Sequence, residues 1–101
     1  METSIIRGLC SAKKAFPEAS FIVFGSRASG TARHDSDIDI CAIFPDMQED
    51  SFEMAYKVRA EIHKYLDEAL DVIVCDQERF TRRSSEPGTI EAVIARDGVP
   101  L

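Results

Sequence analysis

Residues 20–44 read SFIVFGSRASGTARHDSDIDICAIF, and the predicted fold is built around them. It begins with an aromatic and β-branched run, residues 20–24, which predicts a buried strand that ends at Gly25. A second apolar run, from Asp37 to Phe44, predicts another strand, which Pro45 ends. The polar, glycine-containing segment 25–36 lies between them and has room for one helical turn. Because this connection is short, an antiparallel pairing of the two strands is allowed.

The second predicted strand is apolar on both faces, which is typical of a central strand. Side chains alternate between the two faces of a strand. One face therefore carries Ile38, Ile40, Ala42 and Phe44, and the other carries Asp37, Asp39, Cys41 and Ile43. We expect this strand to have a neighbour on each side.

The rest of the chain supplies helices and one more strand. Helical spacing and capping residues predict a first helix that starts near Thr3 or Ser4 and ends before Pro17. A second helix is expected from the capping pair Asp50 and Glu53 through about Leu66, with Phe52 on its buried stripe. A third strand is expected at 70–75, a short helix within 77–85, and a last helix at 90–96 with Thr89 as its cap and Gly98 beyond its end. The order is α-β-turn-β-α-β-α-α, which predicts an α+β fold with a mixed three-stranded sheet.

Length and charge limit the class of protein. The chain has 101 residues with 12 Lys and Arg against 18 Asp and Glu, a net charge of −6. We expect a single domain over residues 1–101, since two independent cores do not fit this length. The excess of acid argues against direct nucleic-acid binding, and no apolar run is long enough for a membrane span. Cys10, Cys41 and Cys75 lie in apolar patterns, so we expect core thiols and a cytoplasmic protein.

Three aspartates are the candidate metal-binding and catalytic residues. Asp37 and Asp39 share one face of a strand, about 7 Å apart along it. Asp71 is the second residue of the next apolar strand and faces away from Leu70 and Val72, so it can complete a three-carboxylate cluster. Each aspartate alone is typical of a solvated strand edge. Together they predict a site for Mg²⁺, or Mn²⁺, with two ions serving phosphoryl transfer.

The turn before this strand carries groups that suit a phosphate. Gly25 allows close approach of the backbone, and the Ser26 hydroxyl adds a donor. Arg27 and Arg33 lie in the same turn and can offset phosphate charge. A Gly-Ser pair alone usually marks only a turn, so the interpretation depends on the order of the two features along the chain.

The spacing Gly25-Ser26-x10-Asp37-x-Asp39 resembles the motif of the DNA polymerase β-type nucleotidyltransferase superfamily. The fuller run GSRASGTARHDSDIDI is similar to the minimal nucleotidyltransferases, the MNT or MntA-like antitoxins of prokaryotes. The resemblance implies that the two motif aspartates and Asp71 bind the metals and carry catalysis.

The same resemblance assigns the nucleotide to the turn. It implies that Gly25 and Ser26 hold the phosphates of ATP, with Arg27 and Ser36 in the nucleotide-binding set. This chain has Ser29 where the family often has arginine, and His34 where it often has proline.

The resemblance also implies a partner. Only 30 residues follow Asp71, so we expect another macromolecule to bring the acceptor. In the MNT family this is a HEPN-domain toxin, which the antitoxin modifies with AMP in a hetero-oligomer. Two alternatives stay open: a binding module that neutralises its partner by occlusion, and a nucleotide-sensing regulatory domain.

Overall fold

The apolar runs of the sequence become the strands of one mixed sheet. A computed structural model describes residues 3–30, 37–47 and 49–101. Strands β1 (Ser20–Phe24), β2 (Ile38–Phe44), β3 (Leu70–Asp76) and β4 (Val99–Pro100) lie in the order β3-β2-β1-β4. β1 is antiparallel to β2 and to β4, whereas β2 and β3 run parallel. The mixed sheet and the central position of β2 are confirmed.

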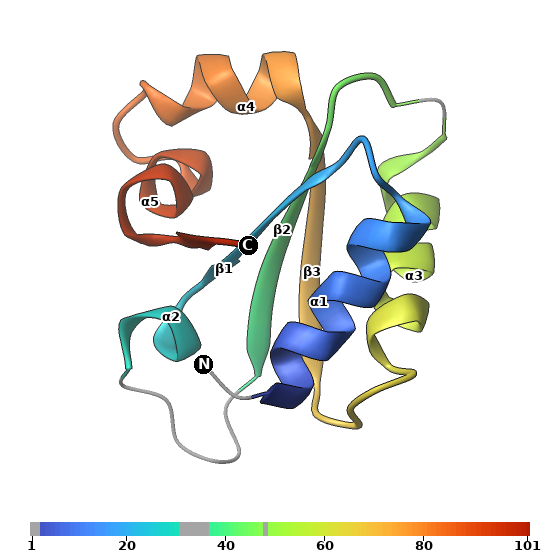
Figure 1. Ribbon diagram of the computed structural model, residues 1–101. Coiled ribbons are helices and arrows are strands. Elements are labelled where there is room, and N and C mark those ends of the chain that lie inside the picture. Colours follow the sequence, from blue (N-terminus) through green and yellow to red (C-terminus); the bar gives the residue numbers. More distant parts are fainter. Residues whose placement is uncertain (1–2, 31–36, 48) are drawn as a thin grey trace.

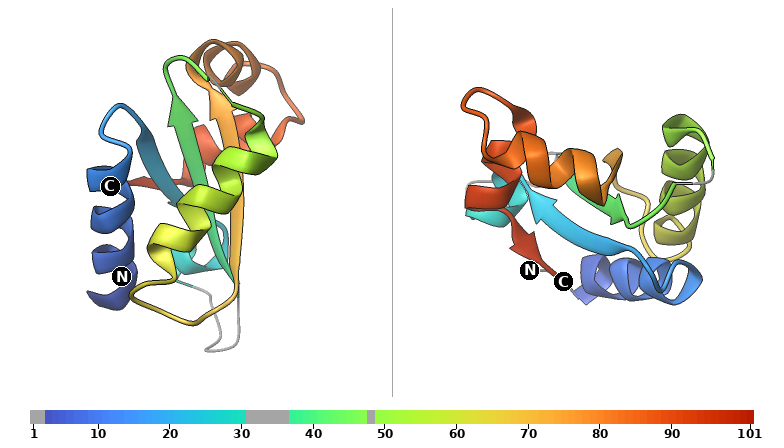
Figure 2. Two further views of the ribbon diagram at one scale, coloured as in Figure 1. Left: turned by 90° about the vertical axis from the view of Figure 1, so that its right-hand side faces the viewer. Right: turned by 90° about the horizontal axis from the view of Figure 1, so that it is seen from above.

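The helices cover both faces of this sheet. α1 (Thr3–Ala15) and α3 (Ser51–Ile62) pack on one face, and α4 (Gln77–Ser84) and α5 (Ile90–Asp97) lie on the other (Figures 1 and 2). α2 (Ser26–Ser29) is a single turn after β1. None of the described helices is both long and apolar enough to cross a bilayer.

The alternation predicted for β2 is the division between two cores. The larger core, under α1 and α3, takes Ile38, Ile40, Ala42 and Phe44 from β2. The smaller core, under α4 and α5, takes Cys41 and Ile43. Asp39 therefore lies on the face covered by α4 and α5, because side chains two residues apart on a strand share a face.

Over the described residues the sheet has four strands, so the predicted number of three was wrong. β4 follows Gly98 and pairs with the free edge of β1, where the Leu101 N–H donates to the Phe21 carbonyl at 2.9 Å. A Cβ at Gly98 would overlap Cγ2 of Ile22, so the lack of a side chain lets the chain pass close to β1. A strand of two residues that includes Pro100 is too short to show an alternating pattern.

The second long helix also differs from the prediction. Asp50 caps α3 as expected, its Oδ1 accepting the Phe52 N–H at 2.9 Å. The helix ends at Ile62 rather than near Leu66, because a turn follows in which Tyr65 N–H donates to the Ile62 carbonyl at 3.0 Å. Phe52 is 82% exposed. At 3.6 residues per turn it lies more than a quarter turn from the centre of the buried stripe, which is made by Met54, Ala55, Val58 and Ile62.

Several smaller boundaries differ by a residue. β2 starts at Ile38 rather than Asp37, β3 extends to Asp76, and α5 extends to Asp97. Cys41 and Cys75 are buried thiols as expected, but Cys10 is exposed, because the buried side of α1 is the stripe of Ile5, Leu9 and Ala12.

Candidate active site

Three strand ends meet where the sequence places its polar residues. β1 ends at Phe24, which pairs with Asp39 near the start of β2. Asp39 in turn pairs with Asp71 near the start of β3. The start of β2 is held against the start of β3, since the Ile38 N–H donates to the Ala69 carbonyl at 3.0 Å. The sheet therefore brings together two aspartates that are 32 positions apart in the chain.

Gly25 lies directly against the Asp39 carboxylate. Its φ of 74° is in the region that favours glycine. A Cβ built at this position would overlap Asp39 Oδ2 and come within 3.2 Å of Cγ. The residue must therefore be glycine for two reasons, its backbone conformation and its contact with the carboxylate. The motif glycine and the second motif aspartate are thus neighbours in space.

The Asp39 carboxylate is under the influence of burial and of two neighbouring charges. Partial burial raises the pKa of Asp39 above its ordinary value of 3.8, and the charges of Asp71 and then Asp37 raise it further. Asp71 and Asp37 are exposed. A site that holds three like charges near one another favours the binding of a cation.

The three described carboxylates do not converge on a common point where a metal ion could bind. Within the described ranges, no three His, Cys, Asp or Glu side chains converge closely enough to hold a metal ion. The donors still fit Mg²⁺ chemically, because they are hard carboxylate oxygens whose mutual repulsion a divalent cation relieves. To bind one metal ion together, the side chains of Asp37, Asp39 and Asp71 must turn toward a common point.

The other predicted binding residues are only partly described. Ser26 is the first residue of α2, and Arg27 follows it, but the Arg27 side chain lies outside the described part. Ser36, Arg33 and His34 also lie outside the described residues. Their predicted roles in nucleotide binding stay predictions.

A cavity that the sequence did not indicate adjoins Gly25. It has a volume of about 440 Å³ and is lined by Phe24, Gly25, Val93 and Asp97. Val93 and Asp97 are four residues apart on α5, so they share one face of that helix. Periodicity in the sequence does not connect Val93 and Asp97 to a loop near residue 25, so this contact between distant segments gave no signal there.

Comparison with known proteins gives a family and a similar fold. The family model described as a nucleotidyltransferase domain matches residues 4–94. A candidate nucleotidyltransferase from Sulfolobus solfataricus has a similar crystal structure, with 24% identity and a TM-score of 0.53 over 99% of this chain and 86% of that one. A toxin–antitoxin structure with AMP-PNP is similar at 18% identity and a TM-score of 0.58, over 92% of this chain and 68% of that one. No curated protein matches the sequence.

Proposed function

Because the chain belongs to the nucleotidyltransferase domain family, we propose that it transfers AMP from ATP to a hydroxyl group of a protein. The observation that supports this most directly is the contact of Gly25 with Asp39, with Asp71 in register beside it. A glycine backbone and adjacent carboxylates are the two parts that a metal–nucleotide site needs.

The proposed reaction is an in-line displacement at the α-phosphorus. The acceptor oxygen forms a bond to this phosphorus while the bond to the bridging oxygen of pyrophosphate breaks, so pyrophosphate leaves and AMP stays on the acceptor. Asp71 takes the proton of the hydroxyl, which its exposed position allows. Gly25 and Ser26 hold the β- and γ-phosphates.

Asp37, Asp39 and Asp71 would hold Mg²⁺, for which Mn²⁺ is a substitute. The metal, when bound, neutralises charge on the phosphates and lowers the barrier to attack. Asp39 is the partly buried member of the set, so it fixes the position of the site relative to the sheet. Asp37 and Asp71 are exposed and supply the adjustable ligands.

We propose a HEPN-domain toxin as the acceptor, with this chain as its antitoxin. The similar toxin–antitoxin structure with AMP-PNP supports a nucleotide and a protein partner of this kind. We propose the cytoplasm as the compartment, since Cys10, Cys41 and Cys75 are free thiols.

A second candidate function is neutralisation of the partner by occlusion. The observation in its favour is a pair of exposed aromatic residues on α3, Phe52 at 82% and Tyr56 at 69% exposed. They are four residues apart, so they form one apolar patch on the helix surface.

The test uses the product of the neighbouring gene as the candidate acceptor, with ATP labelled at either the α- or the γ-phosphate. Nucleotidyl transfer predicts that the α-label enters the partner, that the γ-label does not, and that the intact partner gains the mass of AMP. Transfer of the γ-label instead would mean kinase chemistry.

The variant Asp37→Asn with Asp39→Asn separates the two functions. If AMP transfer neutralises the toxin, this variant loses both transfer and protection of cells while it still binds the partner. If occlusion neutralises it, the variant protects cells as well as the wild type at matched expression.

A further inference from the structure

A second cavity lies at the opposite end of β3 from Asp71. It has a volume of about 360 Å³, within the range of small-molecule sites. The end of β3, α4 and the start of α5 supply most of its lining. The proposed transfer reaction uses none of these residues.

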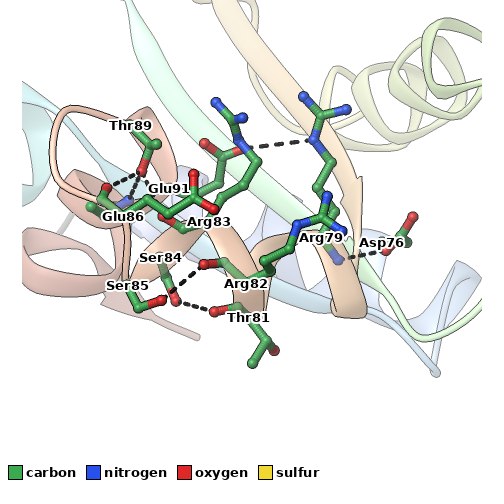
Figure 3. A network of polar contacts seen from close by, with 11 residues as sticks. Asp76, Arg79, Thr81, Arg82, Arg83, Ser84, Ser85, Glu86, Thr89 and Glu91 are labelled. Atoms are coloured by element: carbon green, nitrogen blue, oxygen red, sulfur yellow. Dashed lines mark hydrogen bonds and ion pairs between the residues drawn. The ribbon is translucent and has the colours of Figure 1, made fainter.

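Two arginines on one face of α4 reach the same carboxylate (Figure 3). The Nε atoms of Arg83 and Arg79 lie 3.0 Å and 3.9 Å from Oε2 of Glu91. No other hydrogen bond or ion pair engages these two guanidinium groups within the residues that the structure describes. Their terminal Nη groups therefore remain available as donors.

Two carboxylates in the lining each have an oxygen that accepts no hydrogen bond from the described residues. Glu91 is only 7% exposed, and its Oε1 has no hydrogen-bond partner among the described residues. Asp76 uses Oδ1 to accept the Arg79 N–H at 2.8 Å and cap α4, and its Oδ2 has no hydrogen bond in the described part of the chain. Two guanidinium groups and two carboxylates give this lining a net charge of zero.

The balance of charges selects the class of ligand. A simple anion would meet two carboxylates, and a simple cation would meet two guanidinium groups. A ligand that carries both signs side by side satisfies all four groups. The apolar part of the lining, which includes Ile73, Val74 and Ile90, favours a ligand with an aliphatic portion as well.

We propose that this cavity binds a free α-amino acid with an aliphatic side chain. Its carboxylate accepts hydrogen bonds from the Nη groups of Arg79 and Arg83. Its ammonium group, one carbon away, donates to Glu91 and Asp76. Its side chain packs against the apolar wall.

A purely structural ion pair between α4 and α5 does not explain why Arg79 is placed beside Glu91. That side chain is 57% exposed and its Nε is 3.9 Å from Glu91, so the pair adds little to stability. Arg83, at 3.0 Å and half-buried, is sufficient to compensate Glu91. Arg79 is thus the residue to change without unfolding the chain.

The experiment titrates the full chain with L-leucine at millimolar concentration, without Mg²⁺ or ATP, and follows the arginine Nε–H signals by NMR. We expect the signals of Arg79 and Arg83 to shift. Two analogues, 4-methylpentanoate without the amine and 3-methylbutylamine without the carboxylate, each lose one charge and should bind at least about tenfold more weakly. Equal binding of either analogue, or no shift with leucine, would overturn the proposal.

Variants give a second readout. Arg79→Gln removes a donor, and Asp76→Asn keeps the helix cap but removes a charge, so each should weaken leucine binding by about tenfold or more. Arg82→Gln is the matched control, because Arg82 is on the same helix, exposed and outside the lining. If Arg79→Gln and Asp76→Asn bind leucine as tightly as Arg82→Gln does, the proposed site is contradicted.

Discussion

At the scale of single residues, Gly25 couples backbone conformation to the candidate site. Both Gly25 and Gly30 have positive φ, 74° and 77°, but only Gly25 has neighbours where a Cβ would be placed. Each Gly→Ala change should cost about 1–2 kcal/mol of stability from backbone strain. Gly25→Ala should cost more than Gly30→Ala and should also abolish binding of Mg²⁺–ATP, because Asp39 must move. Urea denaturation and calorimetric titration measure the two effects, and equal behaviour of the variants would contradict the contact.

A second prediction at this scale is how the contribution of Asp39 to stability depends on pH. Since burial and then the charges of Asp71 and Asp37 raise its pKa, the folded chain binds this proton more tightly than the unfolded chain. The contribution of Asp39 to stability is therefore most favourable at acidic pH and falls as pH rises from about 3.8 through the raised pKa. Asp39→Asn should remove this fall, so at neutral pH in EDTA the variant should be at least as stable as the wild type.

The measurement is urea denaturation of both proteins at neutral pH and at a pH below 3.8. A variant that is clearly less stable at neutral pH would mean that Asp39 accepts structural hydrogen bonds instead. We expect Asp39→Asn to lose transfer activity and to keep its stability, because active-site residues often reduce the stability of the folded protein.

At the scale of elements, Thr89 joins the last two helices. Its Oγ1 accepts the Ala92 N–H at 3.1 Å as the cap of α5, and it donates to the Arg83 carbonyl of α4 at 2.7 Å. Thr89→Ala should therefore lower the free energy of unfolding by about 1–2 kcal/mol, whereas Thr89→Ser keeps the oxygen and most of the stability. Thr81→Ala, at an exposed position of α4, is the control. Thermal and urea unfolding measure the series, and a Thr89→Ala loss no larger than that of Thr81→Ala would refute the link.

At the scale of the whole molecule, the charge distribution makes nucleotide and metal binding depend on each other. The net charge is −6, and residues 37–101 hold 15 acidic against 7 basic residues. ATP alone should be repelled, whereas Mg²⁺–ATP should bind at least about tenfold more tightly. Calorimetric titration of ATP in Mg²⁺ and in EDTA measures the difference, at matched ionic strength. Equal affinities would argue against a carboxylate-bound metal at this site.

Much of the fold could be predicted from local patterns. Alternation in residues 37–44 indicated a central strand, and the structure divides those side chains between two cores. Asp50 and Thr89 were identifiable as caps because the hydrogen bond that each makes spans only two or three residues. The motif spacing indicated Asp37 and Asp39, whereas Asp71 was predicted from its place near the start of the next apolar strand.

The features that the sequence missed depend on contacts between distant segments. β4 forms because the edge of β1 is free and Gly98 allows close approach, which no alternation in two residues can indicate. Likewise Phe52 is exposed because packing selected a different stripe of α3.

Local patterns in the sequence were enough to predict β1, β2 and β3 in chain order and the face of each β2 side chain. They also gave the prediction of which residues bind metal and phosphate. These follow from backbone periodicity and from local hydrogen bonds, which act over a few residues. The contact of Gly25 with Asp39, and the meeting of Arg79 and Arg83 at Glu91 beside a cavity, became visible only in the folded chain. Such contacts depend on strand register and helix packing, which are set by the burial of the whole core.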